Sequence, residues 1–122
     1  MTVQHVYNLY DSTIETYIAQ FLSQHDKLMK RECENLYEQA KKIHAQNPVS
    51  AQGSLYRYAD SYLMIHTADF DDQKGVYTQL EHPVVICNFG IFQTAENNAK
   101  AMNDNEKTYS NIINNSSLTN AK

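Results

Sequence analysis

The fold is decided by residues 23–48, which read SQHDKLMKRECENLYEQAKKIHAQNP. Ser23 is a suitable N-cap, and Asn47-Pro48 ends a helix because proline moves the preceding residue out of the α conformation. Charged residues cover most of the surface between these two points. The remaining side chains recur at helical spacing and form one apolar face: Met29, Cys33, Leu36, Tyr37, Ala40, Ile43 and His44. The stretch therefore predicts one amphipathic helix over residues 24–46.

Two short apolar stretches precede this helix. Residues 3–10 and 15–21 are rich in β-branched and aromatic side chains, which favour strands. Between them, Asp11-Ser12-Thr13 can turn the chain through hydrogen bonds from side chain to backbone. The N-terminal part therefore predicts a β-hairpin.

A second hairpin is expected after the helix. Residues 49–61 have the composition of a loop, and residues 62–68 that of a strand. Residues 69–75 predict a turn, since they end in a glycine that suits a left-handed turn position, and residues 76–80 form the return strand. Residues 84–92 are apolar, which favours a short buried strand over a helical turn.

The order of elements, ββ-α-ββ(β), predicts an α+β fold. In this fold a small antiparallel sheet carries the one long helix on one face, over residues 1–92. A chain of 122 residues is long enough for one hydrophobic core only. Residues 93–122 contain eight Asn and few apolar side chains, and they predict a polar tail that is disordered or weakly helical.

The sequence favours a soluble protein without a membrane partner. Its start lacks the basic region of a signal peptide, and the longest apolar run, Val84 to Cys87, is far short of the roughly 20 residues of a membrane span. Cys33 and Cys87 stand outside any CxxC motif, which favours reduced thiols in a cytosolic setting. A disulfide between them stays open, because sequence does not give their separation.

The charge distribution gives little support to nucleic-acid binding. The net charge is −4, and only residues 24–46 lean basic, with five basic residues against four acidic ones. A strong nucleic-acid binder normally has a basic footprint. Tyrosines can stack on bases, although most of those here also suit a core or a sheet face. The candidate phosphate contacts are Lys27, Lys30, Arg31, Lys41, Lys42 and Arg57.

No motif for catalysis, a cofactor or a metal is found. The chain has no P-loop, Rossmann glycine pattern, GxSxG elbow or HExxH, and its five histidines share no ligand-like spacing. The acidic run from Asp69 to Gly75 fails as an EF-hand, because Lys74 stands at the sixth position and Leu80 at the twelfth. We therefore expect no catalytic residue, no metal ligand and no cofactor.

Two enzyme hypotheses stand against this expectation. Cys33 and His44 share the apolar helix face, but about three turns, roughly 16 Å, separate them, so they cannot form a catalytic pair. A nuclease that uses Asp69, Asp71 and Asp72 is the other alternative, and it needs a pocket that the sequence does not reveal. A non-enzymatic protein is the expectation.

Spaced motifs over residues 3–92 resemble a viral family. They are Val6-Tyr7-Asn8-Leu9-Tyr10-Asp11-Ser12, Glu15-x-Tyr17, Phe21, Asn47-Pro48-x-Ser50, Tyr58-x-Asp60-x-Tyr62-Leu63, Asp69-Phe70-Asp71-Asp72-x-x-Gly75 and Pro83. In order and spacing, they are similar to those of the small nonstructural protein of gokushovirus-type microviruses, which are phages with circular single-stranded DNA.

The resemblance implies a role in the viral DNA cycle within the host cytoplasm. Such proteins are inferred to bind single-stranded DNA and to favour its synthesis or packaging, and they have no established active site from which residues can be carried over. The implied partners are single-stranded DNA and viral or host replication proteins. The alternative is a protein-interaction module that acts on a replication, host or capsid protein. The sequence leaves the oligomeric state open.

Overall fold

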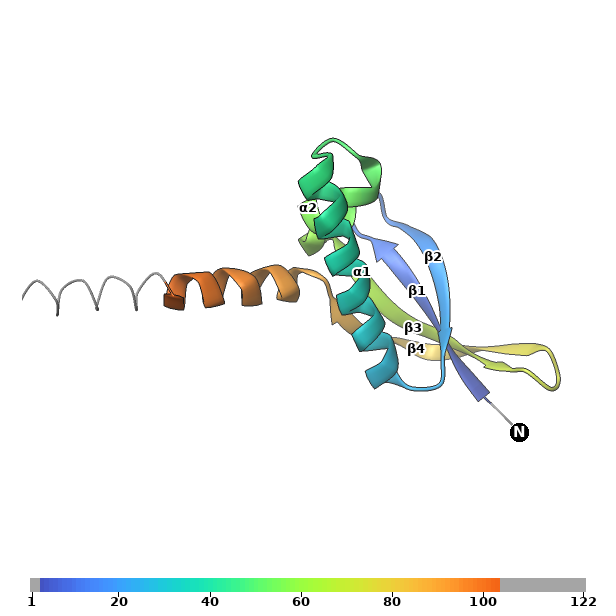
Figure 1. Ribbon diagram of the computed structural model, residues 1–122. Coiled ribbons are helices and arrows are strands. Elements are labelled where there is room, and N and C mark those ends of the chain that lie inside the picture. The colour runs from blue at the N-terminus through green and yellow to red at the C-terminus, as the bar shows by residue number, and fades with distance from the viewer. Residues whose placement is uncertain (1–2, 104–122) are drawn as a thin grey trace, which may run out of the picture. The chain divides into compact units, whose positions relative to one another are not determined.

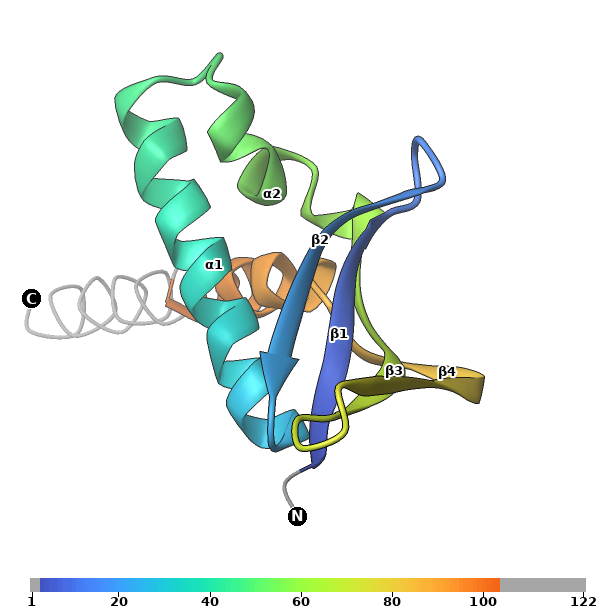
Figure 2. The same ribbon diagram turned by 90° about the vertical axis from the view of Figure 1, so that its right-hand side faces the viewer.

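The computed structural model describes residues 3–103 and has a four-stranded sheet with one long helix (Figure 1). The main elements are β1 (Val3–Asp11), β2 (Thr16–Ser23), α1 (Asp26–Gln46), β3 (Tyr62–Asp71) and β4 (Val76–Asn88). The strands lie in the order β2-β1-β3-β4, and every neighbouring pair is antiparallel. Figures 1 and 2 show α1 on one side of this sheet. The predicted α+β class is confirmed.

The N-terminal hairpin turns where the sequence predicted. β1 pairs with β2 from His5 opposite Ser23 to Asp11 opposite Thr16. In the turn, the Thr13 backbone N–H donates to Asp11 Oδ1 over 3.0 Å, and Glu15 takes a positive φ of 53°. A short polar side chain that accepts from the backbone two residues on is the turn chemistry expected of Asp11.

The helix ends as predicted, but its predicted N-cap is wrong. Ser23 still pairs with His5 at the end of β2, so the residue before the helix is His25, which makes no side-chain cap. Ser23 Oγ instead donates to the His25 carbonyl over 3.2 Å. Asp26 begins the helix, where its negative charge suits the positive end of the helix dipole. The Asn47 N–H donates to the Ile43 carbonyl at the other end.

The predicted loop over residues 49–61 is wrong as well, because three short helical segments fill it. They are η1 (Ala51–Gly53), α2 (Ser54–Arg57) and η2 (Ala59–Ser61). Ser50 caps η1 by accepting from the Gln52 N–H, and Arg57 Nη2 donates back to the Ser50 carbonyl over 2.6 Å. Such local hydrogen bonds stabilise short helical turns that hydrophobic periodicity does not reveal.

The second hairpin is longer than predicted. β3 extends to Asp71, and the turn closes with the Gly75 N–H donating to the Asp71 carbonyl, while Gly75 has a φ of 65°. β4 continues through Pro83 to Asn88, although the sequence predicted a break there and a strand over 84–92. The ladder passes from Ala68 opposite Gln79 directly to His66 opposite Val84, so residues 80–83 form a bulge. An edge strand with a bulge tolerates a proline, which has no N–H to donate.

The core lies between α1 and the sheet. The predicted helix face is buried at Met29, Cys33, Tyr37 and Ala40, and Leu36 is partly buried. The strands and the segment that follows β4 contribute Tyr7, Leu9, Tyr62, Met64, Cys87 and Phe89. Burial of each large side chain stabilises the fold by roughly 1.5–3 kcal/mol.

The chain divides after Phe92 into two units, Met1–Phe92 and Gln93–Lys122. Of the predicted polar tail, residues 93–103 are helical, and residues 104–122 lie outside the described residues. Among the helices of residues 3–103, none combines the length and the apolar character needed to cross a membrane.

Substitution of two neighbouring residues of α1, one buried and one exposed, tests how far the stability of the fold depends on the buried face of this helix. Met29 is 2% exposed, whereas Leu28 is 45% exposed. We expect Met29→Ala to lower the free energy of unfolding by about 2–5 kcal/mol, because it leaves a cavity. Leu28→Ala is the matched control and should cost less than about 1 kcal/mol. Urea denaturation measures both, and equal losses would contradict this account of the core.

Candidate functional site

The structure divides the predicted basic residues into two groups. Lys27, Lys30 and Arg31 lie exposed on the first two turns of α1, and none forms an ion pair within the described residues. Lys41 and Lys42 lie about ten residues further along α1, roughly 15 Å away. We refer to Lys27, Lys30 and Arg31 as the basic trio.

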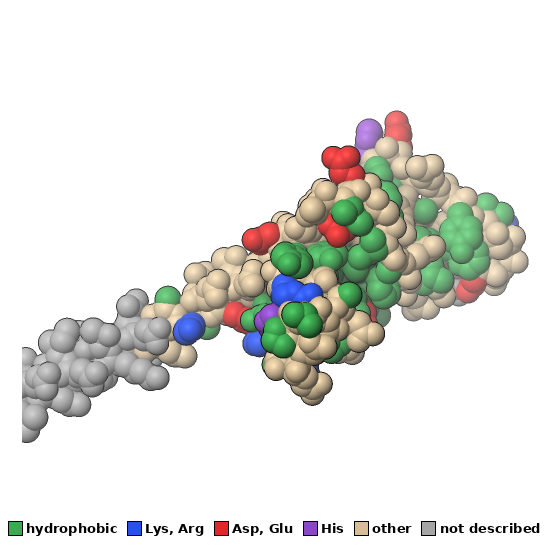
Figure 3. Space-filling view, turned by 90° about the horizontal axis from the view of Figure 1, so that it is seen from above, with side chains coloured by type: hydrophobic (Ala, Val, Ile, Leu, Met, Phe, Trp, Pro, Cys, Tyr) green, Lys and Arg blue, Asp and Glu red, His purple; other side chains and the backbone are tan. Residues whose placement is uncertain are grey.

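Arg57 is held by contacts within the fold. Its guanidinium donates to the Ser50 carbonyl over 2.6 Å and lies 5.8 Å from the centre of the Tyr58 ring. It thereby ties α2 to the segment that precedes it, near the C-terminal end of α1. Lys41 is half-buried, and Lys42 is exposed. In the view of Figure 3, hydrophobic side chains gather into a broad patch, whereas Lys and Arg form no continuous basic surface.

Shallow hollows flank the basic trio. Arg31 borders one with Phe21 and Leu22 of β2, and it borders another together with Lys30, Ile86 and Phe92. Cationic groups and apolar surface therefore adjoin one another on both sides of Arg31. The sequence indicates the cations but not these neighbours, since Phe21 and Leu22 belong to a separate element, and Ile86 and Phe92 lie more than 50 residues further along the chain.

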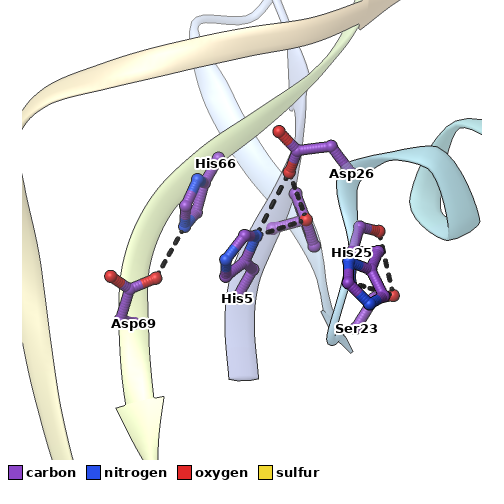
Figure 4. Close-up of polar contacts among 7 residues, drawn as sticks. His5, Ser23, His25, Asp26, His66 and Asp69 are labelled. Carbon is purple, nitrogen blue, oxygen red and sulfur yellow. Dashed lines mark hydrogen bonds and ion pairs between the residues drawn. The ribbon is translucent and has the colours of Figure 1, made fainter. Parts of the chain in front are cut away.

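Five polar side chains meet where α1 begins, and no sequence pattern indicates them (Figure 4). Asp26 Oδ1 accepts from the Tyr7 hydroxyl over 2.5 Å and lies 3.2 Å from His5 Nδ1. His5 Nδ1 is also 2.9 Å from the Tyr7 oxygen. His66 Nε2 bonds to Asp69 Oδ1 over 2.9 Å. We refer to His5, Tyr7, Asp26, His66 and Asp69 as the polar cluster.

The two imidazole rings of the polar cluster stack on each other. Their centres are 4.3 Å apart, and their planes are inclined by 16°. Each ring contacts its own carboxylate, since His5 lies against Asp26 and His66 against Asp69. Sequence spacing does not predict this arrangement, because β1, β3 and α1 each supply part of it.

Electrostatic effects in the polar cluster follow from these contacts. The hydrogen bond from Tyr7 lowers the pKa of Asp26, and His5 lowers it further. Burial and the same hydrogen bond to Asp26 raise the pKa of Tyr7 above its ordinary value. Asp26 therefore stays ionised and Tyr7 stays protonated around neutral pH.

The two cysteines are brought together in the core. Cys33 on α1 and Cys87 on β4 are free, buried thiols that hydrogen-bond to each other. That hydrogen bond and burial raise the pKa of Cys33. The predicted separation of Cys33 from His44 holds, and the His44 ring packs 5.1 Å from that of Tyr56. The sequence alone could not place the two sulfur atoms near each other.

The acidic turn of the second hairpin forms local bonds. Asp71 Oδ1 accepts from the backbone N–H groups of Gln73 and Lys74, and Asp69 pairs with His66. Among residues 3–103, the one group of three ligand-type side chains whose donor atoms converge is His5, Asp26 and His66, and not the aspartates of this turn.

The sheet face opposite α1 carries apolar side chains. Tyr10 on β1 faces away from the buried Leu9 and packs against Tyr17 of β2, with ring centres 4.9 Å apart. Leu22 and Val85 lie on the same side, and both are exposed. We refer to Tyr10, Tyr17, Leu22 and Val85 as the open sheet face. No described helix of the first unit covers it (Figure 2).

Comparison with known proteins now decides the family. Residues 4–92 match a family described as Phage ORF5 protein. The chain belongs to the phage ORF5 protein family. The match includes the basic trio, the polar cluster and the open sheet face, and it confirms the expected phage origin. No curated protein and no solved structure matches the chain.

The hydrogen bond between Tyr7 and Asp26 can be tested by removing the Tyr7 hydroxyl. Tyr7→Phe removes a hydrogen bond to a partly exposed carboxylate, so the free energy of unfolding should fall by about 1 kcal/mol near neutral pH. The folded-state pKa of Asp26 is lowered, so its contribution is present above its unfolded value, about 3.9, and is lost as the pH falls through the folded value.

The difference between wild type and Tyr7→Phe should therefore shrink in acid. Urea denaturation at about pH 7 and about pH 3 measures it. Tyr10→Phe is the control, since the structure gives its hydroxyl no hydrogen bond among residues 3–103. A difference between the Tyr7→Phe variant and wild type that stays constant over this pH range would contradict the assignment.

Proposed function

We propose that this protein is a non-enzymatic accessory protein of the viral DNA cycle in a gokushovirus-type microvirus. It would bind single-stranded DNA in the host cytoplasm and favour its synthesis or packaging. The observation that carries this proposal is the basic trio, three exposed cations without an ion pair in the described part of the chain. Family membership supports the phage role and leaves the ligand to be tested.

The basic trio suits a flexible, single-stranded ligand. Lys27 and Arg31 are one helical turn apart, and Lys30 stands beside them, so successive phosphates can contact them along the helix. The hollows beside Arg31 offer Phe21 and Phe92 as apolar surface against which a base can rest. Binding would then combine phosphate contacts with base contacts and read no sequence.

The acidic surroundings limit the strength of this binding. Glu32 and Glu34 line the hollows beside Arg31, and the net charge of the chain is −4. Three phosphate contacts predict a slope of about −2 in a plot of log affinity against log salt concentration, since single strands give roughly −0.7 for each contact. We therefore propose weak, strongly salt-dependent binding.

Charge reversal tests the basic trio. Fluorescence anisotropy with a labelled oligothymidylate should show binding at low salt that weakens in Lys30→Glu and in Arg31→Glu, and each removed phosphate interaction should reduce the salt slope by about 0.7. Lys74→Glu makes the same charge change at an exposed turn away from α1 and should bind like wild type. Absence of binding at low salt, or an equally weakened affinity in Lys74→Glu, would contradict the proposal.

The open sheet face supports a second candidate function, a protein-interaction module. Exposed apolar side chains on a face without a covering helix are typical of protein contact sites. The partner would be a viral or host replication protein or the capsid. This function needs no basic surface, so the acidic net charge does not oppose it.

The open sheet face can be tested separately from the basic trio. Tyr17→Asp combined with Val85→Asp should abolish recovery of a partner protein from infected cells, because charges would enter an apolar contact. DNA binding should stay unchanged. Val49→Asp is the control, since Val49 is exposed outside the sheet. Equal recovery of the partner with all variants would reject the sheet face as the contact.

A further inference from the structure

The polar cluster contains a set of donor atoms that no part of the proposed function uses. His5 comes from β1, Asp26 from the first residue of α1 and His66 from β3, yet one donor atom of each lies within 4.8 Å of the others. Figure 4 shows His5 joined to Asp26 and the His66 ring beside that of His5, with its own bond to Asp69. Their convergence requires the folded sheet, since 21 residues of sequence separate His5 from Asp26.

We propose that His5, Asp26 and His66 form a binding site for a divalent transition-metal ion, with Zn²⁺ as the favoured ion. Imidazole nitrogen combined with one carboxylate is a donor set that suits Zn²⁺ and Co²⁺, whereas Mg²⁺ and Ca²⁺ prefer oxygen ligands alone. Three protein ligands leave a further position on the ion for water.

The distances are close to those that coordination requires. Donor atoms about 2.0–2.2 Å from a tetrahedral ion lie roughly 3.3–3.6 Å from one another. His5 Nδ1 and Asp26 Oδ1 are already 3.2 Å apart. His66 has to approach by about 1 Å, and the stacked rings have to tilt so that their in-plane lone pairs converge. The His5 and Asp26 side chains, which are 31% and 47% exposed, have room to move toward His66, which is 12% exposed.

Neighbouring groups hydrogen-bond to two of the three ligands, His66 and Asp26. In the tautomer that carries its proton on Nε2, His66 donates to Asp69 and keeps a free lone pair on the other ring nitrogen, as in many carboxylate–histidine–metal arrangements. The Tyr7 hydroxyl orients the Asp26 carboxylate. Asp26 and Asp69 together supply two negative charges, which offset Lys27 and Arg31, two side chains that line a third hollow together with His5 and Asp26.

Two other groups of the chain compete as ligands, and the test must separate them. His25 is exposed beside Asp26 and lines the same hollow. Cys33 and Cys87 offer thiolate donors, but they are buried and hydrogen-bonded to each other. Geometry favours His66 over His25, since His66 belongs to the converging group and His25 does not.

The experiment uses the full chain without a polyhistidine tag. Isothermal titration should show one Zn²⁺ or Co²⁺ ion bound per chain and no saturable binding of Mg²⁺, and the thermal midpoint should rise with Zn²⁺ concentration and fall back with a chelator. Affinity should drop about tenfold or more in His5→Ala, His66→Ala and Asp26→Asn, and about tenfold in Asp69→Asn, which changes no ligand. His82→Ala is the matched control, because its ring is exposed and remote from the ligands in the described structure.

Each contrary result has a defined meaning. Co²⁺ absorption with a thiolate charge-transfer band that disappears in Cys33→Ser would move the ion to the cysteines and overturn the site. Binding that is abolished in His25→Ala but retained in His66→Ala would overturn the ligand assignment. Should circular dichroism show that His66→Ala is unfolded, the more exposed His5 and Asp26 variants decide the question. Wild-type affinity in both would reject the site.

Discussion

The structure depends on the burial of one face of α1 against the four-stranded sheet. Met29, Cys33, Tyr37 and Ala40 repeat at helical spacing and meet the side chains of β1, β3 and β4. A helix of this composition gains little from its own hydrogen bonds in water, so packing provides most of its stability. The same contact covers one sheet face and leaves the other open, and it fixes the direction in which the charged surface of α1 points.

This one contact also creates both candidate sites at the N-terminal half of α1. Because β2 leads directly into the helix, Asp26 lies above β1 and accepts from Tyr7. The turn that follows points Lys27, Lys30 and Arg31 outward. The basic trio and the polar cluster are therefore neighbours with different chemistry: one offers free cations to phosphates, and the other offers paired nitrogen and oxygen donors. Lys27 and Arg31 of the basic trio line one hollow together with His5 and Asp26 of the polar cluster.

Sequence reasoning succeeded where a local pattern carries the signal. The α1 face, the Asp11 turn, the Gly75 turn and the order of the main elements along the chain each follow from periodicity or from turn chemistry within about ten residues. The prediction failed where residues distant in the sequence determine the local structure. Ser23 is an excellent cap by type but remains paired with His5, and Pro83 would end an inner strand but is tolerated in the bulge of an edge strand.

The sequence by itself determined the α+β class, the buried helix face and the set of available cations, because those depend on residue type and on near neighbours. Only the tertiary structure decided which of these residues meet. It separated Arg57 from the basic trio, joined Cys33 to Cys87, and gathered His5, Asp26 and His66 from three elements. The physical reason is that strand pairing and helix packing bring together residues tens of positions apart. The spacing of residues along the chain does not predict those contacts.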